Sequence, residues 1–210
     1  MPRRKGAPEV NAGSMADIAF LLLIFFLVTT TIATDAGLDR VLPPIEPPEN
    51  PPIIKQKNIF TVSINKSGQL LVEEEVMDIR NLRAAAIEFL DNGGAPSGSP
   101  EYCDFCKGKR IPESSDNPDK AIISLKNDRE TKYSTYITVQ NELVGAYNDL
   151  RNREAQRLYN RDFTDMETEY LNPESKDKFT EAELEKLKIK VKTIKALYPQ
   201  KLSEAETTSN

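Results

Sequence analysis

One apolar run constrains this chain more than any other feature. Residues 18–33 read IAFLLLIFFLVTTTIA and contain no charge. Together with Met15, Ala16 and Asp17 the run has 19 residues, and a helix of about 20 residues is needed to cross a bilayer core of about 30 Å. The sequence therefore predicts one transmembrane helix over residues 15–34, which would place this part of the chain in the lipid bilayer.

The charges on either side of the run predict its orientation. Arg3, Arg4 and Lys5 precede it, and the first acidic residue after it is Asp35. Basic residues are retained on the cytoplasmic side of a membrane. We therefore expect residues 1–14 to be a cytoplasmic N-terminus and the rest of the chain to lie outside the inner membrane.

A cleaved signal peptide is the alternative interpretation, because it also combines a basic start with an apolar run. Two features disfavour it. Asp17 interrupts the apolar character, and Thr31 stands at the candidate cleavage site where a small alanine is usual. The two interpretations differ in whether the mature protein keeps Asp17.

Composition argues against a soluble enzyme. The chain has no histidine, which removes the commonest general base, the usual catalytic triads and histidine-containing zinc sites. It also has no glycine–lysine phosphate loop. A formal net charge of -5 gives no sign of nucleic-acid binding. We expect no enzymatic activity, no cofactor, no metal site and no nucleic-acid partner.

Asp17 is the candidate functional residue. An aspartate in the middle of a membrane helix costs about 2.5–3.5 kcal/mol. One interpretation makes Asp17 a helix N-terminal acid, stabilised by the helix dipole, with Ser14 as the N-cap. Neither residue would then have a role beyond starting the helix.

The other interpretation makes Asp17 a proton carrier. Helical spacing puts it on one face with Phe20, Leu21, Ile24 and Val28. A carboxylate on that face should meet a protein partner or a water-lined cavity, because lipid cannot solvate it. Desolvation favours the protonated form of a carboxyl group, so such a group can load and release protons near neutral pH. One helix cannot build the whole path, so a multi-helix partner is implied.

These residues resemble a known family. NAGSMADIAFLLLIFF, residues 11–26, resembles the start of the ExbD/TolR family of biopolymer-transport proteins. Asp17 matches the essential aspartate of that family, and Leu42 with Pro43 resembles its linker motif beyond the membrane. The resemblance covers roughly residues 11–147, with one interruption. The insertion and C-terminal extension described below resemble Bacteroidetes-type ExbD proteins.

The resemblance implies a function. It implies a bacterial inner-membrane subunit with a periplasmic domain, in which a helix dimer sits inside a ring of an ExbB-like polytopic protein. Proton flow through Asp17 would then drive a TonB-like protein and TonB-dependent outer-membrane transport, with protons as the coupling ion. The alternatives are a TolR-like subunit of the Tol-Pal envelope system, and a signal-anchored periplasmic scaffold module without a motor.

A proline-rich linker is predicted over residues 35–57, because prolines favour extended polyproline geometry. It is either a passive stalk or, as the resemblance allows, a regulatory segment that pairs with a neighbouring domain. Residues 58–160 then predict a small α+β domain. Alternating residues 59–64 predict a strand, residues 65–68 a hairpin turn and residues 69–72 the return strand. A helix is expected over 79–90 after Asp78, a buried strand over 121–125 and a long helix from Tyr136 to about Tyr159.

This order predicts an antiparallel-type sheet with helices on one face, and the resemblance adds a further short strand. The expected apolar positions of the two helices are Leu82, Ala86, Phe89, Leu90, Ile137, Val139, Leu143, Ala146, Tyr147 and Leu150.

An insertion rich in glycine, proline and serine is expected over residues 92–119. It contains Cys103 and Cys106, for which a disulfide is the ordinary expectation outside the cytoplasm. A thioredoxin-type redox site lacks the expected strand-to-helix setting, and a zinc site would need a second pair of thiolates from another subunit.

The C-terminal region, residues 161–210, is expected to be a helical extension with a disordered tail. Thr180 and Glu183 predict a capping box, followed by apolar residues at helical spacing and a set of lysines. Two interpretations stay open: a helix packed on the domain, or a docking helix for a partner or an anionic surface. Residues 203–210 are expected to be disordered.

Overall fold

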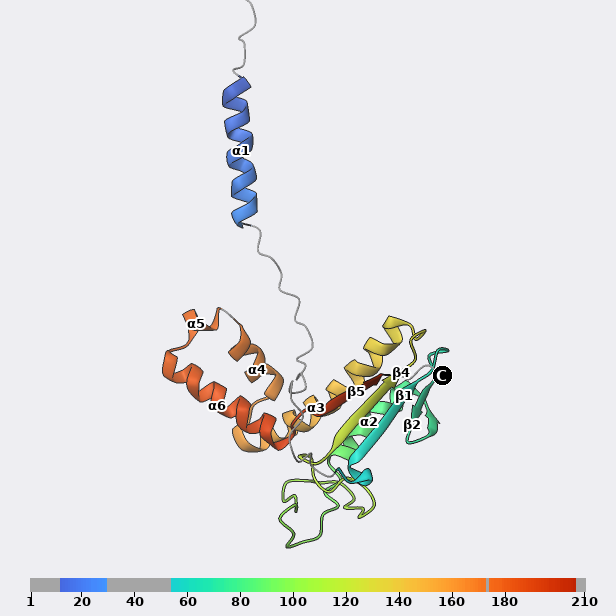
Figure 1. Cartoon of the computed structure of the whole chain (residues 1–210). Coiled ribbons are helices and arrows are strands. Elements are labelled where there is room, and N and C mark those ends of the chain that lie inside the picture. The colour runs from blue at the N-terminus through green and yellow to red at the C-terminus, as the bar shows by residue number, and fades with distance from the viewer. Residues whose placement is uncertain (1–11, 30–53, 173, 207–210) are drawn as a thin grey trace, which may run out of the picture. The chain divides into compact units, whose positions relative to one another are not determined.

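The computed structural model describes residues 12–29, 54–172 and 174–206 (Figure 1). Contacts divide the chain into two compact units, Met1–Pro51 and Pro52–Asn210. The first contains helix α1, and the second contains a five-stranded sheet with the remaining helices.

Helix α1 runs from Ala12 to Thr29 and has 18 residues, a length of about 27 Å at 1.5 Å per residue. It starts three residues before the predicted span, and residues 30–34 of that prediction lie outside the described part of the chain. Within the ranges described, no helix is both long enough and apolar enough to cross a membrane.

The sheet has the strand order β3-β2-β1-β4-β5. Its strands are β1 (Ile59–Ile64), β2 (Leu70–Val72), β3 (Glu75–Met77), β4 (Ile122–Asn127) and β5 (Leu202–Glu206). Strands β1 and β2 form the predicted antiparallel hairpin, and Gly68 in the turn has a φ of 78°, a left-handed conformation that glycine adopts without steric cost. Strand β3 adds a second antiparallel pair.

The prediction of an antiparallel-type sheet is wrong, because the sheet is mixed. Strand β4 pairs with β1 in parallel, with Ile59 opposite Ile122. The chain crosses from β2 and β3 through helix α2 and the insertion before it enters β4. A parallel pair needs such a long crossover connection, whereas a tight hairpin turn can join only antiparallel strands.

The prediction of disorder over residues 203–210 is also wrong for residues 203–206. These residues belong to β5, which pairs in parallel with β4 from Ile123↔Leu202 to Asn127↔Glu206. Residues 207–210 lie outside the described chain. The side chain of Glu204 helps to hold the strand, because Tyr136 Oη and Gln140 Nε2 both donate hydrogen bonds to its Oε1 at 2.6 and 2.8 Å.

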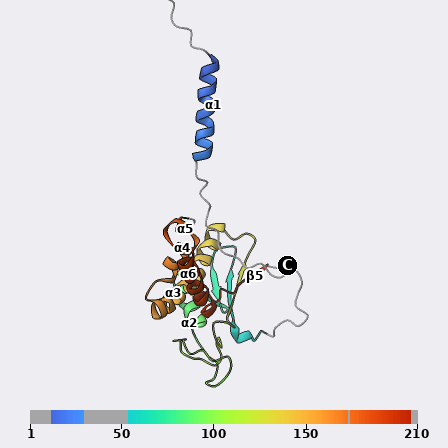
Figure 2. The ribbon, with the colours of Figure 1, turned by 90° about the vertical axis from the view of Figure 1, so that its left-hand side faces the viewer.

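Helices α2 (Ile79–Leu90) and α3 (Tyr133–Tyr159) cover one face of the sheet (Figure 2). Strand β1 alternates between half-buried and buried side chains because only one of its faces meets the helices. Asp78 caps α2 by accepting a hydrogen bond from Arg80 N at 2.9 Å. Of the predicted apolar positions all are buried except Ile137, which is half-buried.

The C-terminal extension packs against the second half of α3. It consists of α4 (Phe163–Leu171), α5 (Ser175–Lys178) and α6 (Glu181–Leu197), and α6 begins at the predicted capping box of Thr180 and Glu183. Phe163, Met166, Leu187, Val191 and Ile194 form a second buried cluster with Ala155. Of the two interpretations, the structure therefore shows the packed helix.

A buried polar cluster fastens this extension to the sheet domain. Asp91, at the end of α2, accepts two hydrogen bonds from the Arg153 guanidinium at 2.6 and 2.8 Å and one from Tyr198 Oη at 2.6 Å. Arg151 donates to the backbone oxygen of Tyr198 at 2.8 and 3.0 Å. The first residue after α6 is thereby bonded to both α2 and α3.

Candidate functional site

Asp17 is the sixth residue of α1, and the first turn of that helix has no acidic residue. The helix dipole acts mainly within the first turn, so it offers Asp17 little stabilisation. Ser14 lies inside the helix, which begins at Ala12, and is therefore not its N-cap. The position of Asp17 argues against the helix-start interpretation.

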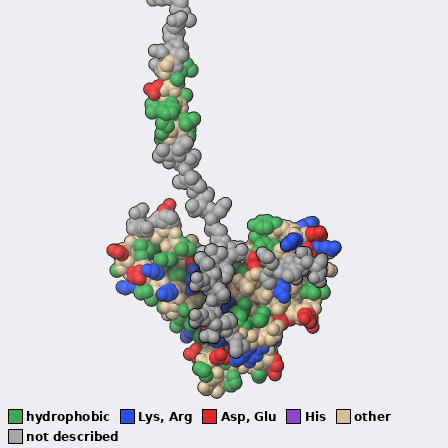
Figure 3. All heavy atoms as spheres, viewed as in Figure 1, with side chains coloured by type: hydrophobic (Ala, Val, Ile, Leu, Met, Phe, Trp, Pro, Cys, Tyr) green, Lys and Arg blue, Asp and Glu red, His purple; other side chains and the backbone are tan. Residues whose placement is uncertain are grey.

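The face of α1 that carries Asp17 is apolar, and its described side chains are exposed. Phe20, Leu21 and Ile24 lie three, four and seven residues further along, which puts them on the same face. Their side chains are 61%, 58% and 41% exposed. Val28 occupies the next position of this face by helical spacing. Figure 3 shows α1 covered mainly by hydrophobic side chains, with acidic atoms towards its N-terminal end.

The predicted linker motif cannot be placed beside these residues, because Leu42 and Pro43 lie outside the described chain. The description resumes at Ile54. From there the end of the linker forms a short 3-10 helix, Gln56–Asn58, which leads directly into β1.

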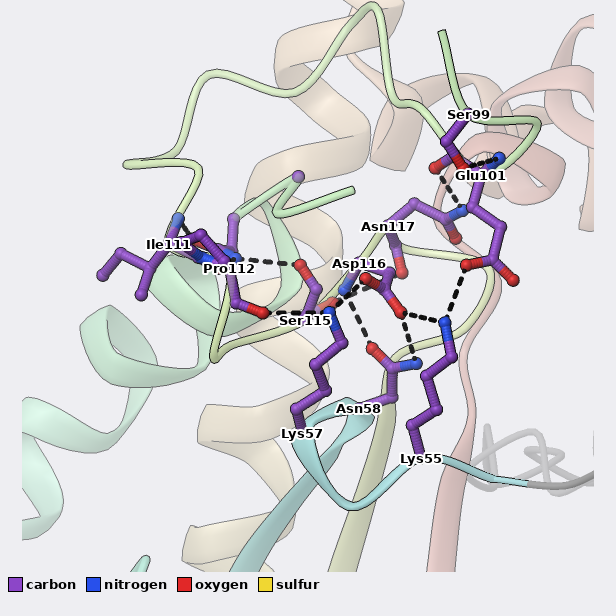
Figure 4. Close-up of polar contacts among 12 residues, drawn as sticks. Lys55, Lys57, Asn58, Ser99, Glu101, Ile111, Pro112, Ser115, Asp116 and Asn117 are labelled. Carbon is purple, nitrogen blue, oxygen red and sulfur yellow. Dashed lines mark hydrogen bonds and ion pairs between the residues drawn. The ribbon is translucent and has the colours of Figure 1, made fainter. Parts of the chain in front are cut away.

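A second site joins this end of the linker to the insertion, and its centre is Asp116 (Figure 4). The Asp116 side chain is only 2% exposed. Its carboxylate lies 2.5 Å from Lys57 Nζ and 3.1 Å from Lys55 Nζ. Asn58 Nδ2 donates to the same carboxylate at 3.1 Å, and Asp116 N donates back to Asn58 Oδ1 at 2.8 Å. Residues 55, 57 and 58, at the boundary between linker and domain, therefore all contact one buried carboxylate.

Two further contacts widen this junction. Lys55 Nζ also donates to Glu101 Oε2 at 3.1 Å, and Lys57 Nζ donates to the backbone oxygen of Pro112 at 2.9 Å. We call the whole set, which links residues 55, 57 and 58 to residues 101, 112 and 116, the linker junction. Figure 4 shows the lysine side chains reaching from the linker towards the insertion.

The electrostatics of the linker junction follow from these bonds. Burial would raise the pKa of Asp116, but the hydrogen bonds from Lys57, Asn58 and Lys55 hold it below its usual value. The hydrogen bonds to Glu101 and Asp116 raise the pKa of Lys55. Asp116 therefore stays negatively charged and Lys55 positively charged at neutral pH.

The insertion has a fixed internal structure. Asn92 Nδ2 donates to the backbone oxygens of Ile111 and Ser115 at 2.8 Å, and Ile111 N donates to Asn92 Oδ1 at 2.9 Å. A disulfide joins Cys103 and Cys106. The insertion is thus a bonded scaffold around the linker junction.

A groove with a volume of about 580 Å³ lies beside the linker junction. Gln56 and Lys57 line it from the linker, and Phe60 and Phe89 line it from β1 and α2. These two rings stack with centroids 5.1 Å apart. The linker residues therefore contribute to the wall of the groove.

Comparison with known families decides the identity of the chain. The family model for the biopolymer transport protein ExbD/TolR matches residues 3–151. The chain belongs to the ExbD/TolR family. No curated protein matches it closely enough to be called a relative. The match spans α1 with Asp17, the linker, strands β1 to β4, α2 and most of α3.

Two parts of this ExbD/TolR protein stand apart from the rest. The family match ends at residue 151, before α4, α5, α6 and β5. The insertion falls inside the matched range but was predicted from the sequence as a departure from the compact family pattern. The ion pairs and hydrogen bonds of Asp116 connect the insertion to residues 55, 57 and 58, which follow α1 in the sequence.

Sequence reasoning missed the residues of the linker junction. Lys55 and Lys57 read as ordinary polar residues at the end of a linker, and Asp116 stands among turn-forming residues. Asn58 and Asp116 are 58 residues apart, so no local pattern relates them. Asp116 is one of three aspartates in residues 92–119, so nothing in the local sequence singles it out.

Proposed function

We propose that this chain is the proton-carrying subunit of an ExbB–ExbD–TonB type energy-transduction complex. In this proposal α1 lies in the bacterial inner membrane as a single-pass helix with a cytoplasmic N-terminus. Asp17 takes up and releases protons, and the unit Pro52–Asn210 lies in the periplasm and passes work to a TonB-like protein. The chain carries out no enzymatic step and needs no cofactor, because protons are the coupling ion.

One observation carries the proposal: a carboxylate lies inside an otherwise apolar helix, on an exposed apolar face. Membership of the ExbD/TolR family supports it, because the family consists of biopolymer transport proteins. An ionisable group in such a helix is expected to face a protein partner or a water-filled path. The membrane potential supplies about 2.3 kcal/mol per charge per 100 mV, so it can bias a cyclic movement of a helix that carries one.

The partners follow from the family. Proteins of this family generally work with ExbB/TolQ-type and TonB/TolA-type partners. We propose that the apolar face of α1 packs against a second copy of α1 and against an ExbB-like ring. The side chains of Phe20, Leu21 and Ile24, all exposed in the single chain, would be covered in that assembly.

Replacement of Asp17 tests the proposal. Asp17→Asn keeps the size of the side chain but cannot carry a proton. We expect energised uptake to fall to the level of a strain that lacks the chain, while co-purification with the ExbB-like partner persists. Asp17→Glu is the matched variant and should retain part of the uptake. Normal uptake by Asp17→Asn would end the proposal.

The client of the complex is tested in the same strains. A TonB-type client predicts loss of outer-membrane uptake with an intact envelope in Asp17→Asn. A TolR-like role predicts detergent sensitivity and defective envelope constriction with normal uptake.

A further inference from the structure

We propose that the linker junction is a releasable strap, in which the insertion holds residues 55–58 against the domain and lets them go when the linker is pulled. This inference rests on the proposed function only for the source of the pull. The strap itself is argued from the contacts of the unit Pro52–Asn210.

The insertion side of the strap is firmly built. Within the insertion, Asn92 Nδ2 donates to the backbone oxygen of Ser115, and Ala95 N donates to the backbone oxygen of Asp116 at 3.1 Å. Asp116 N donates to Asn58 Oδ1. Asn117 Nδ2 donates to the backbone oxygen of Glu101 at 2.8 Å. The two acidic residues that receive the linker lysines are therefore fixed relative to each other.

The linker side is partly exposed and lies outside the sheet ladder. Ile54, Lys55 and Gln56 are exposed, and Lys55 keeps a side-chain exposure of 53%. The backbone bonds of this segment are local, from Asn58 N to Lys55 O at 2.9 Å and from Ile59 N to Gln56 O. The sheet ladder begins only at Ile59. Residues 55–58 therefore lie outside the paired residues of the sheet.

Release would have a mechanical consequence. Four residues span up to about 13 Å when fully extended, so opening the strap adds a free segment of at most that length to the linker. It would also remove Gln56 and Lys57 from the wall of the neighbouring groove. Tension in the linker would thus change the lining of the groove beside β1 and α2.

Hydrogen exchange tests the strap without reference to proton coupling. In the full chain, Asp116→Asn removes the charge that attracts both lysines but keeps the size of the side chain. We expect the amides of Asn58 and Ile59 to exchange at least tenfold faster than in the wild type, with unchanged protection of Val62. The matched control is Asp119→Asn, whose partner is Lys201 and not the linker. Equal exchange in both variants at Asn58 and Ile59 would overturn the strap.

Cross-linking in membranes tests the release. Carbodiimide joins Lys55 Nζ to the Glu101 carboxyl carbon as an amide, and the displaced oxygen leaves as the urea of the reagent. Peptide mass spectrometry then measures the closed fraction. We expect the cross-link yield to fall at least twofold when membranes are energised, and not to fall in Asp17→Asn.

The outcomes separate the two proposals. If the yield of the Lys55–Glu101 cross-link is the same with and without a proton gradient, in a strain with normal uptake, the release is overturned. Asp17 remains the proton carrier in that case if Asp17→Asn blocks uptake. Normal uptake by Asp17→Asn overturns the proposed function, and the hydrogen-exchange result on Asp116→Asn still decides whether the strap exists.

Discussion

The buried cluster around Asp91 offers a sharp test of how the C-terminal extension is held. The Asp91 side chain is 6% exposed and accepts a bidentate pair of bonds from Arg153 and a bond from Tyr198. Asp91→Asn removes the negative charge and turns an NH₂ group towards the arginine or the tyrosine. The guanidinium then keeps at most one of its two bonds.

The expected cost follows from the burial of this pair. Breaking a buried ion pair by removing one partner costs about 3–5 kcal/mol. The Arg153 side chain is 27% exposed and regains some water, so we expect the lower end, about 3 kcal/mol. For a unit of this size each kcal/mol lowers Tm by about 2–4 °C, which gives a drop of roughly 6–12 °C.

Urea and thermal unfolding of the unit Pro52–Asn210 would measure this cost. The matched control is Asp119→Asn, which breaks a 3.0 Å ion pair whose aspartate is 64% exposed. Exposed pairs contribute about 0–1 kcal/mol. If Asp91→Asn cost no more free energy of unfolding than Asp119→Asn, the cluster would not fasten the extension and the reasoning would be refuted.

Two further predictions concern the same unit. Burial would raise the pKa of Asp91, but the bonds from Arg153 and Tyr198 hold it below the usual 3.8; the carboxylate therefore stabilises the fold above that pH, and this stability is lost as pH falls through the lowered pKa. Urea midpoints between pH 6 and pH 3 should fall more steeply in the wild type than in Asp91→Asn, and parallel curves would contradict this. Thr180→Ala removes the capping box of α6 and should cost about 1 kcal/mol, whereas Thr193→Ala, in the same helix, should cost less; equal urea midpoints for the two would show that the cap adds nothing.

Much of the local structure was predictable because it depends on neighbours in the sequence. The bounds of β1 and α2 agree with the predicted 59–64 and 79–90. An alternating strand and a helix preceded by Asp78 carry their own signals, since side-chain period and caps are set within a few residues. The capping box at Thr180 was predictable for the same reason.

Strand β5 shows where such reasoning fails. Residues 202–206 read LSEAE, which has little of the β-branched and aromatic character of a strand. The strand exists because β4 offers a free edge and because Tyr136 and Gln140 bind Glu204. Those partners lie more than 60 residues away, so the local sequence could not indicate them.

The sequence by itself determined that an uncharged apolar run carries one aspartate, because composition and helical spacing are properties of a single segment. Asp17 and its face were fixed in this way, and the family match includes them. Only the tertiary structure decided that the sheet is mixed and that the lysines at the end of the linker pair with Asp116. It also decided that Tyr198 donates a hydrogen bond to Asp91, 107 residues away in the sequence. Each of these depends on which distant segments the hydrophobic core brings together, and no pattern of neighbouring residues records that choice.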